Sequence, residues 1–301
     1  MATFTITGAT GSVGKAIVAQ LLSEKHHVRV LSTRQNLEWK GVKTYYWNPA
    51  QGEIDLASLE GTDHLIHLAG TTVSKRWTAK YKQSINDSRV YTSQTLIDAL
   101  QKLEKAPSSC VSASAIGFYG SDFERTMVEG DLPADDFLAA VTRNWEQYTR
   151  KLGNDKRRSI QLRIGIVLDK GAGVLGELVP LAKAGIASPL GSGKQWSSWI
   201  HIKDLARMFI HAAISTNIAS GPYNAIGPNP ATNKDLTKTI CKVLSRPMLL
   251  PSVPGFVLRL FLGEMATLAL MSQKVSNKKI LKTGFAFEFE NLEDALRDVL
   301  K

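Results

Sequence analysis

The stretch VSASAIGFYG, residues 111–120, has the residue types of a strand that ends at a reaction site. Its small and apolar residues predict a buried strand, with Ser114 near the end. A hydroxyl there can hydrogen-bond a substrate oxygen, and Tyr119, five positions later, carries a second hydroxyl able to transfer a proton. We therefore interpret Ser114 and Tyr119 as candidate catalytic residues. The alternative for Tyr119 is packing under the following loop.

A second group of residues with chemical meaning is TGATGSVG, residues 7–14. Gly8 permits a tight turn, Gly11 lets the backbone approach a pyrophosphate, and Gly14 lets the next helix pack closely. The N-terminus of that helix would face the phosphates. We expect a dinucleotide to bind at this turn; the alternative is an ordinary strand–helix connection. The predicted contacts are Thr7, Gly8, Thr10, Gly11, Ser12, Val13 and Gly14.

The next strand, at residues 27–33, bears on the choice between NAD and NADP. NAD-binding folds usually place an acidic residue at its end, to bind the ribose 2′-hydroxyl. This chain has Ser32, Thr33 and Arg34 there, and no acid before Glu38. An arginine and two hydroxyls suit a 2′-phosphate, which a carboxylate would repel. NADP(H) is therefore the expected cofactor, and a plain surface arginine is the alternative.

Alternating strand and helix patterns supply the framework for these residues. Strand patterns occur at 3–10, 27–33, 43–48, 64–70, 109–115 and 159–169, and helical patterns at 13–26, 79–103 and about 137–152. This alternation predicts a Rossmann-type, doubly wound parallel sheet of the α/β class. At the end of strand 64–70, the backbone of Leu68, Ala69 and Gly70 would border the adenosine ribose.

We predict two domains. Residues 1–230 would form the dinucleotide-binding domain, with the glycine- and proline-rich segment 170–200 contributing site loops. Residues 231–301 would form a small, mainly helical cap. Within the cap, the apolar stretch 255–271 contains Arg259 and Glu264. It is too short and too charged to span a bilayer, so we expect a docked amphipathic helix.

The composition excludes several classes of partner. The formal charge is +10, but the basic residues are scattered, and their two dense clusters lack the interleaved aromatic residues that stack on bases. We therefore expect a solvated basic surface and no nucleic-acid or membrane partner. Cys110 and Cys241 stand far apart, outside any metal-ligand pattern. We expect no metal and no disulfide, and a cytoplasmic location, since the chain opens directly on a strand pattern.

These motifs together resemble the extended short-chain dehydrogenases/reductases. The closer resemblance is to the atypical NAD-dependent epimerase/dehydratase-like branch with a C-terminal domain of unknown function. Further stretches that carry it are HLAG (67–70), SASAIGFYG (112–120), LRIGIVL (162–168), PLGSGKQWSSWIHIKDLA (189–206) and KTGFAF (282–287). The resemblance implies that Ser114 matches a reactive serine and that Arg163 lies near the cofactor. A buried ion pair is the alternative for Arg163.

The resemblance also implies a Tyr-x-x-x-Lys pair on the helix after Ser114, and here the chain departs from the pattern. Leu138 and Thr142 stand at the approximate positions, and no Tyr-x-x-x-Lys occurs anywhere in the chain. Arg89 stands where many members carry asparagine. A permanent charge suits an anion clamp better than a proton shuttle, and a surface arginine paired with an acid is the alternative.

Three aromatic residues are candidates for the substrate site. Trp77 and Trp199 would form an apolar wall, with core packing as the alternative. His201 can titrate near neutrality, although the resemblance implies a structural hydrogen bond for it.

Two hypotheses for function follow. The first is an NADP(H)-dependent oxidoreductase or epimerase-like enzyme, a monomer or homodimer, acting on a small and, given Arg89, anionic substrate. The second is a non-catalytic NADP(H)-binding regulatory or interaction protein, with a link to cell division through some relatives.

Overall fold

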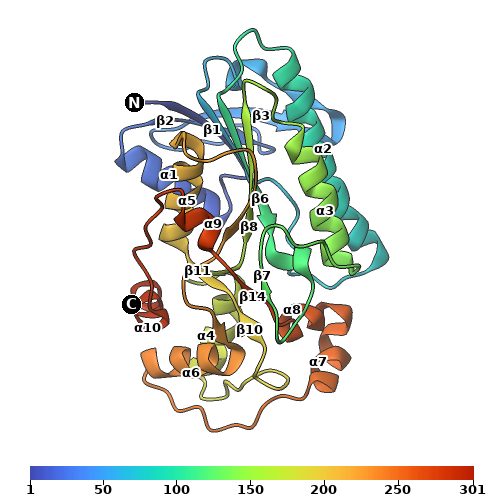
Figure 1. Cartoon of the computed structure of the whole chain (residues 1–301), viewed down its shortest axis with the longest axis vertical. Coiled ribbons are helices and arrows are strands. Elements are labelled where there is room, and N and C mark those ends of the chain that lie inside the picture. The colour runs from blue at the N-terminus through green and yellow to red at the C-terminus, as the bar shows by residue number, and fades with distance from the viewer.

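The computed structural model describes residues 1–301, and its central feature is an eight-stranded sheet (Figure 1). The strand order is β12-β8-β6-β5-β1-β2-β3-β4, and every neighbouring pair is parallel except β3 and β4. The bounds are β1 (Thr3–Thr7), β2 (His27–Ser32), β3 (Lys43–Asn48), β4 (Glu53–Ile54), β5 (His64–His67), β6 (Ser109–Ala115), β8 (Arg158–Ile164) and β12 (Gly221–Ala225). The predicted doubly wound parallel sheet is confirmed. Its order reverses between β1 and β5, which opens a crevice at their carboxyl ends.

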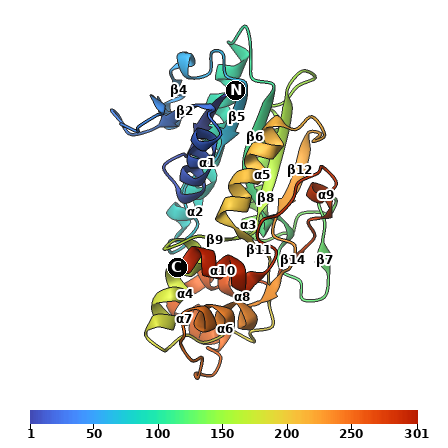
Figure 2. The same cartoon turned by 90° about the vertical axis from the view of Figure 1, so that its left-hand side faces the viewer.

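Two pairs of helices cover the sheet, one pair on each face (Figures 1 and 2). Helices α1 (Ser12–Ser23) and α5 (Ile202–Ile214) pack on one face, and α2 (Ala79–Gln101) and α3 (Phe137–Arg150) on the other. Thr78 and Asp136 cap the N-termini of α2 and α3 by accepting backbone N–H groups through their side chains. Because α2 and α3 follow the parallel strands β5 and β6, both helices begin at the carboxyl edge of the sheet.

A second core lies below the sheet in Figure 1. It joins β9 (Ile166–Leu168), α4 (Gly173–Lys183) and β11 (Trp199–His201) to α6 (Asn233–Val243) and α10 (Leu292–Leu300). Its buried residues include Leu175, Leu178, Trp199, Leu236, Ile240 and Leu296. Two short strands, β10 (Trp196–Ser197) and β13 (Ala231–Thr232), also pair across this region. Residues from 170–200 thus share one core with the C-terminal helices.

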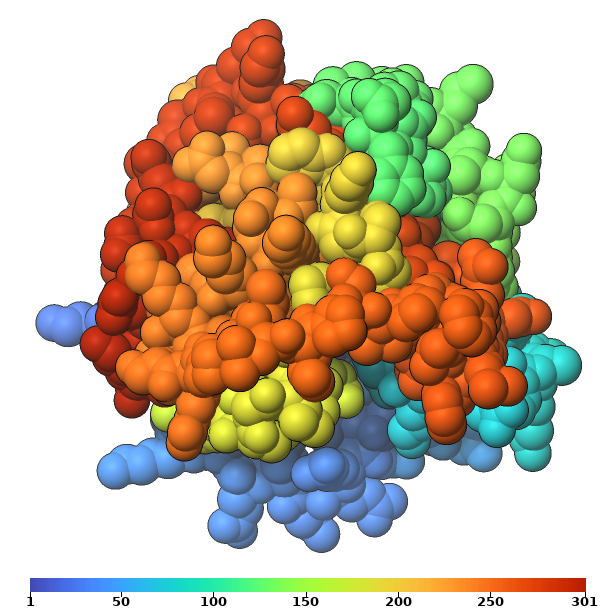
Figure 3. All heavy atoms as spheres, turned by 90° about the horizontal axis from the view of Figure 1, so that it is seen from below, coloured from blue at the N-terminus to red at the C-terminus, as the bar shows by residue number.

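The C-terminal segment after α6 differs in one respect from the sequence-based expectation. Residues 255–270 are helical, as α7 (Gly255–Leu262), η4 (Gly263–Ala266) and α8 (Thr267–Leu270), but α7 has no buried residue. Phe256, Leu260 and Phe261 are all more than 70% exposed. Gly263, at φ +60°, ends α7 after eight residues. No other element covers the apolar residues of α7, so this helix is not docked as the sequence pattern predicts. Figure 3 shows this orange segment at the lower surface.

The remaining elements are short connections. They are η1 (Pro49–Gln51), η2 (Leu56–Ser58), η3 (Ile116–Tyr119), β7 (Thr126–Met127), β14 (Lys274–Val275) and α9 (Lys278–Leu281). No helix has the length and apolar character needed to cross a membrane. Both cysteines are buried and free, and no cluster of His, Cys, Asp or Glu has a metal-binding arrangement.

Candidate functional site

The glycine turn after β1 is enforced by close backbone contacts. Gly8 has φ +70°, and a Cβ atom there would lie 2.8 Å from the Ala69 nitrogen. A Cβ on Gly14 would lie 2.5 Å from the Ala9 Cα. Both distances are shorter than real carbon contacts, so no larger residue fits without moving the backbone. The turn is thereby pressed against the end of β5 and against α1.

Gly11 differs from the other two glycines because it is exposed and a Cβ atom there would meet no clash. It is exposed and caps α1 without a side-chain hydrogen bond, and the nearest atom to a Cβ there would be the Gly8 oxygen at 3.4 Å. Thr10 and Ser12 beside it are also exposed, and Val13 is half-buried. The N-terminal amides of α1 can therefore meet an anion, and the helix dipole favours a negative charge there.

Arg34, just after the end of β2, is a cation without a partner in the protein. Ser32 is buried and its hydroxyl accepts the Arg34 N–H at 3.0 Å, while Thr33 and Arg34 are exposed. The Arg34 guanidinium forms no ion pair or hydrogen bond within the protein. It is free to bind a phosphate beside the crevice.

His67, which the sequence-based reasoning did not single out, fixes the backbone on the other side of the crevice. The Thr7 hydroxyl oxygen accepts the N–H groups of Leu68 and Ala69 at 3.2 and 3.3 Å. The same hydroxyl lies 2.7 Å from Nδ1 of His67, so it donates its hydrogen there. The Nε2–H of His67 then donates to Ser93 at 3.3 Å. Burial lowers the pKa of His67 to about 3, so the ring is neutral.

Ser114 lies inside a buried polar network. Its hydroxyl donates to Oε1 of Glu146 on α3 at 2.7 Å, and the serine is only 3% exposed. Arg163 on β8 binds the same carboxylate through Nε at 2.7 Å and Nη2 at 2.9 Å. Arg163 therefore makes the buried ion pair that was the alternative in the sequence interpretation. As placed, the Ser114 hydroxyl is not available to a substrate oxygen.

Tyr119 belongs to the same network. Its hydroxyl donates to Oδ1 of Asn224 at 2.6 Å and accepts from Nη1 of Arg163 at 2.9 Å. Burial raises its pKa to about 12, against the opposing effect of Arg163. The phenol is therefore protonated, enclosed and fully hydrogen-bonded. Glu146 and Asn224 lie 32 and 105 positions from their partners, and no local motif marked them.

Ala115, the last residue of β6, is the one residue of this strand that is not fully buried, and it has no hydroxyl. Side chains alternate along a strand, so Ala115 points away from the face that holds Ser114. On α3, Leu138 packs against η3, since a Cβ on Gly117 would be 3.4 Å from the Leu138 Cβ. Thr142 donates its hydroxyl to the Leu138 carbonyl at 2.7 Å. Neither α3 position offers a proton carrier.

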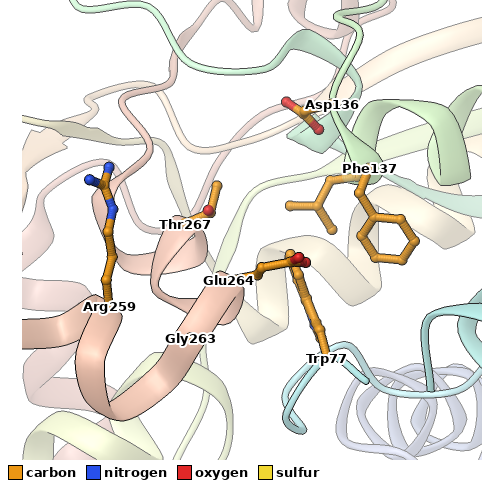
Figure 4. A pocket seen from close by; sticks show the side chains of 8 residues that line it. Trp77, Asp136, Phe137, Arg259, Gly263, Glu264 and Thr267 are labelled. Carbon is orange, nitrogen blue, oxygen red and sulfur yellow. The ribbon is translucent and has the colours of Figure 1, made fainter. Parts of the chain in front are cut away.

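A cavity of about 390 Å³ lies beside Leu138, between the sheet domain and the α7–η4 segment. Figure 4 shows Trp77 and Phe137 on one side and Arg259, Glu264 and Thr267 on the other. Trp77 packs edge-on to Phe137, with ring centroids 5.2 Å apart, and Glu264 forms an ion pair with Lys82 of α2. The cavity therefore combines an aromatic wall with two carboxylates, Asp136 and Glu264, and the unpaired guanidinium of Arg259.

Arg89 does not make the surface ion pair considered as its alternative. Its Nη1 donates to the carbonyl oxygens of Thr71 and Ile85 at 3.1 and 2.8 Å. Its guanidinium carbon lies 4.7 Å from the centre of the Trp145 ring. Burial lowers the pKa of Arg89 to about 10, so the group remains charged at neutral pH.

Of the three aromatic residues proposed to line a substrate site, only Trp77 borders the cavity. Trp199 is 1% exposed within the second core, so core packing, its alternative, is what the structure has. His201 is also 1% exposed and accepts the Lys203 N–H at 3.1 Å, which caps α5. Its ring stacks on Phe289 at 3.7 Å, and desolvation lowers its pKa. Neither residue lines the cavity.

Comparison with known proteins places this site in context. The family described as the NAD dependent epimerase/dehydratase family matches residues 4–227, and a domain of unknown function (DUF1731) matches residues 253–299. Epimerase family protein YfhF of Bacillus subtilis (strain 168) is 36% identical over 296 residues, covering 98% of this chain and 97% of its own. The chloroplastic epimerase family protein SDR39U1 homolog of Arabidopsis thaliana is 34% identical over 307 residues, covering 99% and 87%.

A solved structure is similar over the same length. The crystal structure of human epimerase family protein SDR39U1 (isoform2) with NADPH has a TM-score of 0.88 and 28% sequence identity. The similarity covers 99% of this chain and 98% of that chain. The sheet, the crevice and the C-terminal helices are thus shared as one arrangement.

Proposed function

Because this chain belongs to the NAD dependent epimerase/dehydratase family, we propose that it is an NADP(H)-dependent oxidoreductase or epimerase-like enzyme acting on a small molecule. The observation that carries the proposal is the glycine crevice beside a β2 end that has Arg34 and no acid. The NADPH in the structure of the human relative supports the same cofactor here.

The residues at the crevice fit a dinucleotide phosphate. Gly8 and Gly14 leave no space for a Cβ, whereas Gly11 opens toward the crevice at the N-terminus of α1. Arg34, with the hydroxyls of Ser32 and Thr33, would hold the 2′-phosphate. When bound, the nicotinamide supplies or accepts a hydride, and the protein contributes position and electrostatics.

The substrate would occupy the cavity between Trp77, Leu138 and Glu264. Its volume of about 390 Å³ lies in the range of small-molecule sites. In this reading Ser114 and Tyr119 are positioning residues, because they hold β6 and η3 through Glu146 and Asn224. Two carboxylates line the cavity, and Asp136 already accepts the Ala139 N–H as the N-cap of α3. Glu264, which pairs with Lys82, is therefore the group that we propose exchanges a proton with the substrate.

A second candidate function is non-catalytic NADP(H) binding that a protein partner senses. It is favoured by Leu138 and Thr142, which stand where the resemblance implies the tyrosine and lysine, and by the hydrogen bond that commits the Ser114 hydroxyl to Glu146. Tight NADPH binding without NADPH oxidation across a broad panel of carbonyl compounds would favour this alternative. Turnover of any member of the panel would favour the enzyme.

The cofactor assignment is tested by calorimetric titration of NADPH and NADH into the wild type and Arg34→Glu. We expect the substitution to weaken NADPH about tenfold or more and to leave NADH nearly unchanged, because only NADPH carries the 2′-phosphate. Lys40→Glu, an equal charge change at an exposed residue beyond β2, is the matched control. Equal weakening of both cofactors by Arg34→Glu would refute the assignment.

We also propose that the protein works in a reducing compartment such as the cytoplasm. Cys110 and Cys241 are both buried and unpaired, which suits an environment that keeps thiols reduced. The proposed partners are the cofactor and a small-molecule substrate, with no nucleic acid and no membrane.

A further inference from the structure

Arg89 is a cation without an acidic partner at the end of the dinucleotide crevice. Its side chain is half-buried between α2 and α3, and only Nη1 has hydrogen-bond partners, both of them carbonyl oxygens. Nε and Nη2, which together carry three N–H groups, have no partner in the protein. Neither nitrogen is among the fully buried polar atoms that lack a partner, so both are open to solvent and can be reached by a ligand that carries a negative charge.

The position of Arg89 separates it from the glycine turn. A Cβ on Gly70 would lie 3.5 Å from Cγ and 3.6 Å from Cζ of Arg89, while a Cβ on Gly8 would meet Ala69 and Leu68. The tripeptide Leu68–Gly70 therefore runs between the glycine turn and Arg89. The pyrophosphate of a dinucleotide would lie on the glycine side, at the N-terminus of α1. An anion at Arg89 would lie on the other side of this tripeptide.

Trp145 supplies a second unpartnered donor beside Arg89. Its ring lies 4.7 Å from the guanidinium carbon, it is 7% exposed, and its Nε1–H is buried without a hydrogen-bond partner. A buried indole N–H usually has a partner, so an acceptor is missing here as well. Arg89 and Trp145 thus both have N–H donors without a protein acceptor, and a ligand with acceptor oxygens would supply one.

Arg89 and Trp145 lie on the two helices, α2 and α3, whose earlier residues stand near the cavity. Lys82 precedes Arg89 by seven positions on α2, and Leu138 precedes Trp145 by seven on α3. Near the cavity the same helices meet where the Lys82 ammonium lies 5.0 Å from the Phe137 ring centre. Seven helical residues span about 10 Å. Arg89 and Trp145 do not line the cavity itself, so a substrate that meets them extends about 10 Å from it along the two helices.

We propose that Arg89, backed by Trp145, binds the carboxylate or phosphate group of the substrate, which makes the substrate a small anionic metabolite. This inference rests on the proposed function, because it assumes that the cavity beside Leu138 receives the substrate. It assigns Arg89 to the substrate and leaves the cofactor phosphates to the α1 N-terminus and Arg34.

The test uses malonate and inorganic phosphate as probes, titrated calorimetrically at constant ionic strength into NADPH-saturated protein. We expect one saturable site for at least one probe in the wild type. Arg89→Met should weaken that binding at least tenfold, Arg89→Lys should weaken it less, and Trp145→Phe, which keeps an aromatic ring but removes the indole N–H, should also weaken it. Lys80→Met, at an exposed lysine on the same helix, should leave it unchanged. Circular dichroism checks that each variant is folded.

Three outcomes would overturn the proposal. They are no saturable binding of either probe to the wild type, equal binding to wild type and Arg89→Met, and loss of NADPH affinity in Arg89→Lys as large as its loss of probe affinity. The last outcome would assign Arg89 to the cofactor. Failure of the wild type to bind NADPH at all would be seen before any probe is added, and it would refute the proposed function separately.

Discussion

Ser114 donates its hydroxyl hydrogen to Glu146 over 2.7 Å in the interior, and Glu146 is at the same time bound by Arg163 through two nitrogens. One carboxylate therefore ties together β6, α3 and β8. The carboxylate is 1% exposed, as is Arg163, so water does not screen the pair. The network stabilises the carboxyl end of the sheet, where the candidate site lies.

The first prediction concerns this ion pair. Glu146→Gln should lower the free energy of unfolding by about 3–5 kcal/mol, because it leaves the Arg163 charge buried without a counter-ion. Arg150→Met is the matched control, since Arg150 binds the same carboxylate at 3.3 Å but from a side chain that is 55% exposed. It should cost less than about 1 kcal/mol. Urea denaturation measures both, and equal losses would contradict a stabilising role for the buried pair.

The second prediction distinguishes a positioning role of Ser114 from a catalytic role. Ser114→Ala should lower the free energy of unfolding by about 1 kcal/mol, because one buried hydrogen bond to Glu146 is lost while Arg163 still holds the carboxylate. NADPH affinity should stay unchanged within twofold. Denaturation and calorimetric titration check the two parts. If turnover of a substrate fell 100-fold with stability intact, Ser114 would be catalytic after all.

His67 gives the third prediction, which concerns acid stability. Its pKa is about 3 in the folded protein against 6.5 as the ordinary value, so protons bind the unfolded chain first as the pH falls. The stability that depends on neutral His67 is complete above pH 6.5 and is lost progressively from there toward pH 3. By pH 5 the loss should reach about 2 kcal/mol.

The measurement is the free energy of unfolding at pH 7 and pH 5 for the wild type and His67→Asn. Asparagine keeps an acceptor for Thr7 but does not titrate, so the variant should lose about 2 kcal/mol less than the wild type over this interval. Asn in place of the exposed His27 controls for the number of histidines. A parallel decline in the wild type and His67→Asn would show that His67 does not control acid stability.

Much of the fold and the crevice could be predicted because their signals are local. Strand and helix periodicity gave the parallel sheet, and the glycines of residues 7–14 gave the turn after β1, where the structure has it. The residues around Ser114 could not be assigned in this way. Whether a hydroxyl at position 114 faces a crevice or the interior depends on strand phase, and Ala115 takes the half-open position.

The hydrogen-bond partners of Ser114 and Tyr119 could not be predicted from local sequence patterns, for a related reason. Glu146 and Asn224 reach Ser114 and Tyr119 only after α3 and β12 have packed on the sheet. Trp77 and Trp199 look alike in sequence, yet one borders a cavity and the other fills a core. The exposure of α7 also depends on tertiary packing, which an apolar pattern alone does not specify.

The fourth prediction compares two glycines with nearly equal backbone conformation. Gly8 has φ +70° and Gly52 has φ +71°, but a Cβ on Gly52 would have no atom within 4 Å, whereas one on Gly8 would meet the Ala69 and Leu68 backbone. Gly52→Ala should cost about 1–2 kcal/mol for the left-handed conformation alone. Gly8→Ala should cost more and weaken NADPH binding. Denaturation and titration of both variants test this, and similar results for the two would show that contact with β5 is unimportant.

The last prediction concerns Glu264, which lines the cavity and forms an ion pair with Lys82 of α2. The two side chains are 64% and 28% exposed, so the ion pair should contribute little to stability. Glu264→Gln should therefore change the free energy of unfolding by less than about 0.5 kcal/mol. If the cavity is the substrate site, the same variant should lower the turnover of any compound that oxidises NADPH by about 100-fold, through loss of a proton-exchanging carboxylate.

Glu288→Gln is the matched control, because Glu288 is 53% exposed, pairs weakly with Arg207 at 3.9 Å and lies outside the cavity. Loss of turnover in both variants would indicate a general charge effect, and unchanged turnover in Glu264→Gln would exclude this carboxylate as the proton carrier.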